Sequence, residues 1–228
     1  MEAEKFLVIA AHADDEVLGC GGTIARLIYA GRTVKVLILC SPTYNARGED
    51  SISKAKGIVQ VYNANEILGS EVSFADDRFL RLKDNKFDIT PLLDITQQIE
   101  DELSKEAVDI ILTHSHKDLN IDHQITNLAV ITACRPFIMK NLSGIYTFEV
   151  PSSTECNRNE AFKPNYYVQL SRENFDKKVK ALQAYKSEKR DFPHPRSEEY
   201  IEALATTRGV ECSWKYAEGF ELIYGVML

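Results

Sequence analysis

The chain has 228 residues, of which 44% are hydrophobic and 27% charged, as in an ordinary globular protein with a sizeable core. Its formal net charge of −7 argues against a nucleic-acid-binding surface. The five cysteines are scattered and odd in number, which argues against a disulfide framework or a cysteine-based zinc site and favours a reducing, cytoplasmic location. No apolar run approaches the roughly 20 residues that a membrane span needs.

Apolar runs and helical spacing alternate along the chain. Nearly continuous apolar runs predict buried strands at 5–12 and 33–40, and helical spacing predicts a helix at 17–31 between them. Further along, the same criteria predict a helix at 51–69, a strand at 71–74, a helix at 90–105 capped by Thr90, a strand at 107–115, a helix at 124–136, strands at 144–150 and 163–170, helices at 171–190 and 198–209, and a strand at 220–228. This alternation predicts a parallel-sheet α/β fold, with residues 1–228 forming a single domain.

A histidine and three acids follow the first predicted strand. The stretch AHADDE places His12, Asp14, Asp15 and Glu16 in the turn before the first helix, and open α/β sheets bind ligands at the carboxyl ends of their strands. His12 and Asp15 can converge on one cation, and zinc accepts such nitrogen and oxygen ligands. Asp14 would stay free beside the metal as a base. Acids also favour the first turn of a helix, but that preference does not account for the histidine next to them.

The glycines of the first helix suggest a dinucleotide-binding loop only weakly. HADDEVL separates Gly19, Gly21 and Gly22 from the strand, whereas the dinucleotide fingerprint follows its strand directly. Close packing of the helix on the sheet, or a close approach of the backbone to a substrate, explains these glycines better.

A second polar cluster surrounds the end of the strand at 107–115. It consists of His114, His116, Asp118, Asn120, Asp122 and His123. A catalytic zinc usually has three protein ligands and an open position, and His123 is the candidate third ligand, with Asp122 beside it to orient its ring. The alternatives are structural: Asn120 or Asp122 could cap the next helix, and His114 could be a core histidine.

The two clusters together resemble a known family. AHADDEVLGCGG is similar to the A-H-P-D-D-E signature of the LmbE/PIG-L zinc-dependent N-deacetylases, and DLNIDH is similar to their second motif, which typically ends in H-P-D-H. The stretches FKPNYYVQLS, PHPRSEEYIEALATTRG and YAEGFEL extend the resemblance over essentially the whole chain. It implies a Rossmann-like α/β fold with helices on both faces of a mostly parallel sheet, removal of an N-acetyl or similar N-acyl group from an amino sugar or sugar conjugate, and a homo-oligomer.

Position by position, the resemblance assigns His12, Asp15 and His123 as metal ligands and Asp14 as general base. Zinc is the implied metal, although iron, cobalt or manganese also suits nitrogen and oxygen ligands. The resulting hypothesis is that a zinc-bound water attacks the amide carbonyl, and that Asp14 takes its proton and returns it to the leaving amine.

This sequence departs from the family pattern at several positions. Ala13 replaces a proline that only stiffens the first motif. Asn120 replaces the histidine that begins the second motif, and its amide can donate a hydrogen bond to an oxyanion but carries no charge. The arginine and glutamate that the family usually has in the helix before the dipeptide LG have no clear match, so Arg47, Glu49 or Arg78 could replace the substrate contact of the arginine.

The loop DFPHPRS adds two candidates for substrate contact, His194 and Arg196, in a segment that its prolines stiffen. The alternative is an exposed turn before a helix capped by Ser197. Two other functions are consistent with the same motifs. One is an inactive or weakly active sugar- or nucleotide-binding protein, which the Asn120 replacement suggests, and the other is an amidase that cleaves thiol–sugar conjugates.

Overall fold

The computed structural model describes residues 4–40, 51–75, 82–139, 141–186, 188 and 190–226. Within these ranges seven strands form one sheet in the order β3-β2-β1-β4-β5-β7-β6. The strands are β1 (Lys5–Ala10), β2 (Thr33–Ile38), β3 (Glu71–Phe74), β4 (Ile110–His114), β5 (Gly144–Phe148), β6 (Tyr166–Leu170) and β7 (Tyr216–Gly225). The strands from β3 to β5 in this row run parallel, and β7 is antiparallel to both β5 and β6.

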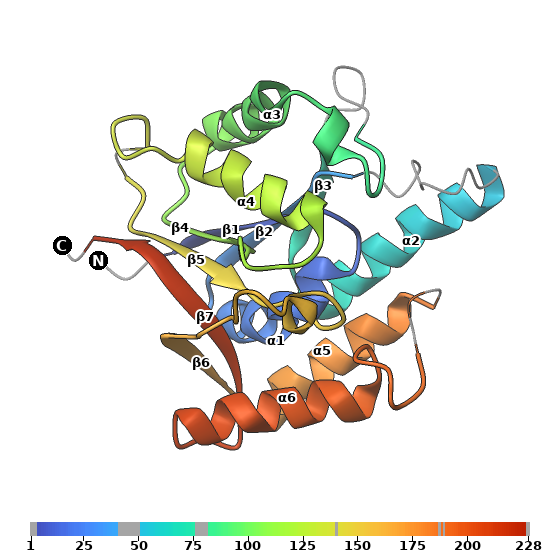
Figure 1. Ribbon diagram of the computed structural model, residues 1–228. Coiled ribbons are helices and arrows are strands. Elements are labelled where there is room, and N and C mark those ends of the chain that lie inside the picture. Colours follow the sequence, from blue (N-terminus) through green and yellow to red (C-terminus); the bar gives the residue numbers. More distant parts are fainter. Residues whose placement is uncertain are drawn as a thin grey trace.

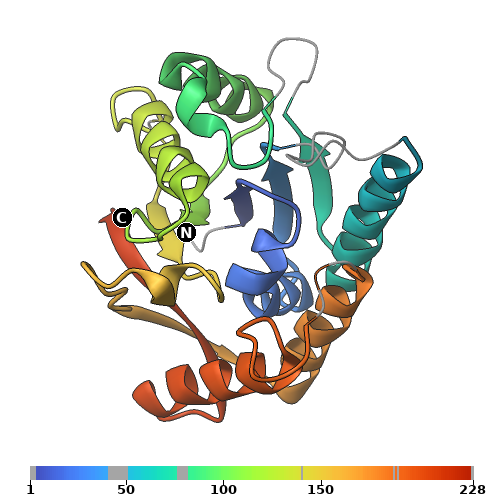
Figure 2. The same cartoon turned by 45° about the vertical axis from the view of Figure 1, so that its right-hand side comes forward.

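Helices cover both faces of this sheet (Figure 1, Figure 2). They are α1 (Asp15–Tyr29), α2 (Ser51–Leu68), α3 (Leu92–Lys105), α4 (Ile121–Ala133), α5 (Arg172–Ala184) and α6 (Glu198–Glu211), with the short 3-10 helices η1 (Phe87–Ile89) and η2 (Thr154–Cys156). The helices α3 and α4 pack together on one face, α1, α2 and α5 cover the other, and α6 packs on β7. The predicted Rossmann-like α/β fold class is confirmed.

The central strands are mainly apolar because both of their faces are buried. Along β1, Leu7 and Ile9 belong to the core beneath α3 and α4, whereas Val8 and Ala10 belong to the core beneath α1 and α2. Polar side chains can gather, without entering either core, beyond the ends of the strands.

Several element boundaries differ from the prediction. The helix α4 begins at Ile121, three residues early, because Asn120 caps it and accepts a hydrogen bond from the Asp122 N–H at 2.9 Å. The helix α3 begins at Leu92, and Thr90 does not cap it: Thr90 is extended, as a residue before proline tends to be. The charged helix α5 ends at Ala184 rather than at residue 190.

The glycines of α1 allow the helix to lie close to the sheet. A Cβ atom on Gly19 would lie 2.2 Å from the Phe148 ring, and one on Gly22 would lie 2.4 Å from Leu170. Both distances are too short for real atoms, which supports the packing explanation for this glycine cluster rather than a nucleotide-binding loop.

A buried ion pair bridges a break in α1. The backbone of Cys20 is non-helical (φ −146°, ψ 21°), so the following N–H groups need other partners. Glu218 accepts hydrogen bonds from the N–H groups of Gly22 and Thr23 at 3.0 and 2.6 Å. Lys178 donates to Glu218 at 2.6 Å and to the carbonyl of Leu18 at 2.8 Å. The Lys178–Glu218 pair therefore joins the two halves of α1 across the break at Cys20, and the first of these halves begins at the predicted site.

Among the helices of the described ranges, none is both long enough and apolar enough to cross a bilayer.

Candidate active site

The two polar clusters found in the sequence meet at one edge of the sheet. The strands β1 and β4 are parallel neighbours, so their carboxyl ends lie side by side. The turn after β1 leads into α1 and carries His12, Asp14 and Asp15. The loop after β4 leads into α4, whose first turn carries Asp122 and His123.

Three donor atoms converge at this edge. His12 Nδ1 lies 3.3 Å from His123 Nε2 and 3.3 Å from one carboxylate oxygen of Asp15, and His123 Nε2 lies 3.2 Å from that same oxygen. Ligands about 2.0 Å from a tetrahedral zinc are about 3.3 Å apart, so the spacing fits such an ion. Two histidines and one carboxylate are also a donor set that catalytic zinc commonly has. The residues present therefore fit a metal with one position left for a substrate or water.

His123 is oriented by Asp118. Its Nδ1 lies 3.1 Å from an Asp118 oxygen, so that its other ring nitrogen is left for the metal. Asp118 in turn accepts hydrogen bonds from the hydroxyls of Ser153 and Thr154. We expected Asp122 to orient His123, and this was wrong, because neighbouring residues of a helix do not face each other.

Asp122 instead orients His12. Its Oδ2 lies 2.9 Å from His12 Nε2, on the side of the ring away from the proposed metal. The carboxylate also accepts backbone hydrogen bonds from Asn85 at 2.7 Å and Phe87 at 3.0 Å, which secure the loop before η1 against α4. Asp84 in that loop lies 3.4 Å from the same His12 nitrogen. Each histidine of the trio formed by His12, Asp15 and His123 thus has a further carboxylate at its other ring nitrogen.

The electrostatic field at the trio favours positive charge. Burial lowers the pKa of His12, but its hydrogen bonds to Asp122 and Asp15 outweigh this and raise the pKa to about 10. Burial also opposes protonation of His123, yet Asp15 and Asp118 raise its pKa to about 9. The charge on His123 in turn holds the pKa of Asp15 well below its usual range, against the effect of burial. A dication bound here would take the place of the two histidine protons.

Asp14 lies next to the trio in an unusual conformation. Its backbone is left-handed (φ 95°, ψ −24°) and its side chain is buried. Burial raises the pKa of Asp14 well above its ordinary value, although the neighbouring Arg196 acts in the opposite direction. Arg196 donates to an Asp14 oxygen at 2.8 Å and is held by Glu188 at 2.8 Å and the Ser152 hydroxyl at 2.9 Å. Arg196 thus lies beside Asp14, and Ser197, the next residue, caps α6 as the alternative for this loop predicted.

The other histidines lie outside the trio. His114 is fully buried, accepts a hydrogen bond from the Ala11 N–H at 2.8 Å and stacks on His123. Burial lowers its pKa to about 3, so it is a neutral core histidine. His116 is exposed and lies 3.7 Å from Glu160. His194 accepts the backbone N–H of Arg196 at 3.0 Å and so supports the loop that carries this arginine.

The remaining candidates divide into two groups. Asn120 is the cap of α4, which was one of the alternatives left open. Its side-chain oxygen Oδ1 accepts the capping hydrogen bond from the Asp122 N–H. The substrate candidates Arg47 and Arg78, with Glu49, lie outside the described residues. Sequence reasoning assigned no role to Asp84, Asp118, Ser153, Thr154 or Glu188. The serine-threonine stretch that follows β5 was the feature of the sequence that could have indicated a polar loop at this edge.

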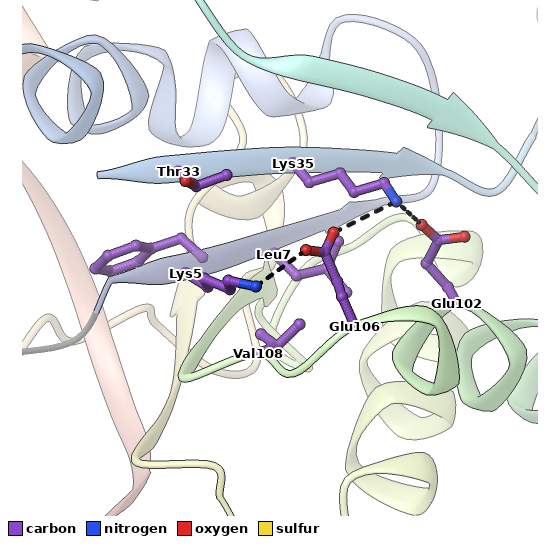
Figure 3. Close-up of a pocket in the computed structure, with 8 residues that line it drawn as sticks. Lys5, Leu7, Thr33, Lys35, Glu102, Glu106 and Val108 are labelled. Carbon is purple, nitrogen blue, oxygen red and sulfur yellow. Dashed lines mark ion pairs between the residues drawn. The ribbon is translucent and has the colours of Figure 1, made fainter. Parts of the chain in front are cut away.

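A second group of charges lies at the opposite edge of the sheet (Figure 3). Lys35 pairs with Glu102 at 2.7 Å and with Glu106 at 3.6 Å, and Lys5 pairs with Glu106 at 3.5 Å. These residues come from the amino ends of β1 and β2 and from the end of α3. Each carboxylate here has a lysine partner, so this group is complete without an added ion.

Comparison with known proteins places the chain in a family. Residues 7–134, more than half of the chain, match the PIG-L family, described as GlcNAc-PI de-N-acetylase. An uncharacterized deacetylase of Escherichia coli, YaiS, is 31% identical over 187 residues, which are 79% of this chain and 90% of YaiS. The diacetylchitobiose deacetylase of Thermococcus kodakarensis is 26% identical over 100% of this chain and 86% of its own.

The fold comparison agrees. The N,N'-diacetylchitobiose deacetylase of Pyrococcus horikoshii superimposes with a TM-score of 0.77 at 21% identity, covering 97% of this chain and 84% of its own. The family match, the sequence relatives and the fold thus agree with one another, and the matched residues include the histidine–carboxylate site at the carboxyl ends of β1 and β4. The chain belongs to the PIG-L (LmbE-like) family of deacetylases.

Proposed function

We propose that this protein is a metal-dependent N-deacetylase that removes an acetyl or similar acyl group from an amino sugar or a sugar conjugate. The observation that carries the proposal is the trio of His12, Asp15 and His123, whose donor atoms lie 3.2–3.3 Å apart beside the buried Asp14. The relatives named for diacetylchitobiose support an N-acetylated sugar as the substrate class.

The trio would hold one zinc ion, with Asp118 and Asp122 fixing the rings of the two histidines. When bound, zinc supplies Lewis acidity, the property that acidifies water and polarises a carbonyl oxygen. Other divalent metals with the same ligand preference are compatible with this donor set.

Asp14 would act as general base and then as general acid. It takes a proton from the attacking water as the new C–O bond forms at the amide carbon. It then gives this proton to the nitrogen as the C–N bond breaks, so that a carboxylic acid and a free amine form, and the acid passes its proton to the amine or to the solvent. Its buried position raises its pKa, which favours the uptake of the proton in the first step.

Asn120 and Arg196 would assist at the carbonyl and the substrate. The side-chain oxygen of Asn120 accepts a hydrogen bond from the N–H of Asp122. This leaves the side-chain NH₂ of Asn120 as a neutral donor for the developing oxyanion. Arg196 keeps its charge next to Asp14 and is 23% exposed at the side chain, so it remains accessible to a substrate. We keep His194 as a residue that supports Arg196, and Arg47 and Arg78 as further candidates for substrate contact.

The test combines metal removal with one substitution. Protein stripped by a chelator should release no acetate from N-acetylglucosamine, diacetylchitobiose or a thiol conjugate of an acetylated amino sugar, and zinc should restore release. Asp14→Asn should keep the metal and lower kcat by about a hundredfold to ten-thousandfold. Full activity in metal-free protein would refute the proposal. Zinc binding without acyl release from any substrate of the panel would instead favour a sugar-binding protein of the same fold.

Three other predictions from the sequence belong to this proposal. The five cysteines are free, which supports a reducing compartment such as the cytoplasm. A single domain over residues 1–228 should unfold in one cooperative transition. The homo-oligomer should be visible as a mass above 25.8 kDa in sedimentation, and a strict monomer would contradict it.

A further inference from the structure

The backbone of Asp14 requires an explanation. Aspartate enters the left-handed region more readily than most residues other than glycine, but the conformation is still less favourable than the right-handed one and persists where the surroundings hold it. The carbonyl of Asp14 starts α1 by accepting the N–H groups of Val17 and Leu18 at 3.1 and 2.9 Å. Its own N–H donates to the Glu16 carboxylate at 3.1 Å. Glu16 therefore holds this conformation from the N–H side.

Glu16 is itself fixed by two distant side chains. It is fully buried, and a carboxylate in such a place needs hydrogen bonds to offset the lost hydration. The Tyr185 hydroxyl donates to its Oε1 at 2.6 Å, and the Asn65 amide donates to the same oxygen at 3.1 Å. One oxygen of Glu16 thus holds Asp14, while the other is held by α2 and by the end of α5.

The segment that begins at Tyr185 reaches Asp14 by two routes. Tyr185 is 2% exposed and follows the last residue of α5. From there the chain continues to Glu188 and Arg196; Glu188 holds Arg196, and Arg196 donates to the Asp14 carboxylate. Tyr185 acts on the Asp14 backbone and Arg196 on its side chain. Both lie outside residues 7–134, the part of the chain that matches the family.

We propose that Tyr185 is a positioning residue for Asp14. By fixing Glu16 it holds the left-handed backbone of Asp14, and with it the place of the Asp14 carboxylate beside the metal ligands. This inference rests on the proposed function, in which Asp14 is the base.

The test removes only one hydroxyl. Tyr185→Phe should lower kcat by about tenfold to hundredfold, the size of effect seen when support residues of a metal site are replaced, with KM and metal content unchanged. The matched control is Tyr216→Phe. Tyr216 is also buried and donates to a carboxylate, that of Glu202, at 2.7 Å, but it has no contact with Glu16 or Asp14. This control should lose comparable stability and keep its kcat.

A second readout does not depend on activity. In metal-free protein the Asp14 amide should exchange its hydrogen about tenfold faster in Tyr185→Phe than in wild type, since its acceptor Glu16 is loosened, and at the wild-type rate in Tyr216→Phe. In a Glu16→Gln background, adding Tyr185→Phe should change kcat little, because both act through one contact.

The outcomes separate the two proposals. If Asp14→Asn keeps full activity, the proposed function fails. If Asp14→Asn is inactive but Tyr185→Phe has wild-type kcat, the positioning role alone fails. It also fails if Tyr216→Phe loses as much kcat, or if the loss in Tyr185→Phe persists in full in the Glu16→Gln background.

Discussion

The two edges of the sheet carry charged clusters that are built in opposite ways. At the amino edge, Glu102 and Glu106 are each paired with a lysine of a neighbouring strand (Figure 3). At the carboxyl edge, Asp15, Asp118 and Asp122 surround His12 and His123 and raise the pKa of both rings against the effect of burial, so that protons or a bound dication must balance these carboxylates. The first cluster is complete in itself, whereas the second stores negative charge around a set of convergent donors. An incomplete charge balance in a buried place therefore distinguishes a site from an ordinary ion-pair cluster.

The largest expected difference between the edges concerns activity. Asp15→Asn replaces the proposed carboxylate ligand by a poor one, so metal content and deacetylation should both be lost. Metal catalysis contributes several kcal/mol, which corresponds to about a thousandfold in rate or more. Glu106→Gln at the other edge should leave both unchanged. Metal analysis together with acetate release measures the two, and an Asp15→Asn protein that keeps its metal and its rate would remove the distinction.

The burial of the lysine, and whether a second cation is present, should decide what the loss of a cationic partner costs in stability. Lys178 and Glu218, beneath the site, are 6% and 5% exposed at their side chains. Lys178→Met leaves the Glu218 charge buried with backbone N–H partners but no cation, so the free energy of unfolding should fall by about 3–5 kcal/mol. At the amino edge Glu102 is also buried, but Lys35 is 21% exposed and Lys105 remains as a second partner, so Lys35→Met should cost about 1 kcal/mol or less. Denaturant unfolding gives both values, and equal losses would contradict this difference between the two pairs.

The carboxylates behind the histidines should have a smaller effect than the ligand itself. Asp118→Asn and Asp122→Asn keep the shape of the side chain but remove the charge that orients His123 and His12. Each should weaken metal affinity by about tenfold to hundredfold. Competition with a chromophoric chelator measures this affinity. Glu102→Gln is the control at the other edge, and equal affinities for all three variants and wild type would contradict the assigned roles.

The smallest effect is a pH dependence at the amino edge. Burial raises the pKa of Glu102, but its hydrogen bonds to Lys105 and Lys35 outweigh this and lower the pKa. A lowered pKa contributes stability above the ordinary glutamate pKa and loses it as the pH falls. Glu102→Gln should therefore reduce the free energy of unfolding by less than about 1 kcal/mol at neutral pH. The difference from wild type should shrink as the pH falls below the ordinary glutamate pKa and vanish only below the lowered pKa of the folded protein. A difference that grows on acidification would contradict this sign.

The fold and the pair of motifs could be foreseen because each depends on local sequence. Apolar runs such as that of β1 fit only a strand buried on both faces, and the order of strands and helices then limits the topology. The polar residues directly after β1 and β4 had to meet, since parallel neighbours end at the same edge. His12, Asp15 and His123 could therefore be grouped before any coordinates were known.

The partners of these residues could not be foreseen in the same way. Asp122 was expected to orient His123 because the two are adjacent in sequence, but the helix turns them apart and Asp122 contacts His12 instead. Glu188 and Arg196 lie more than 170 residues from Asp14, and nothing in the local pattern joins them to it.

The sequence by itself determined the α/β class, the two clusters and the histidine–carboxylate donor set, because hydrophobic periodicity and strand ends are local properties. Only the tertiary structure decided which carboxylate supports which histidine, and that Tyr185 and Arg196 reach Asp14. These contacts depend on how α4 is rotated and on where the chain after α5 packs. Both are set by long-range packing, which no short stretch of sequence encodes.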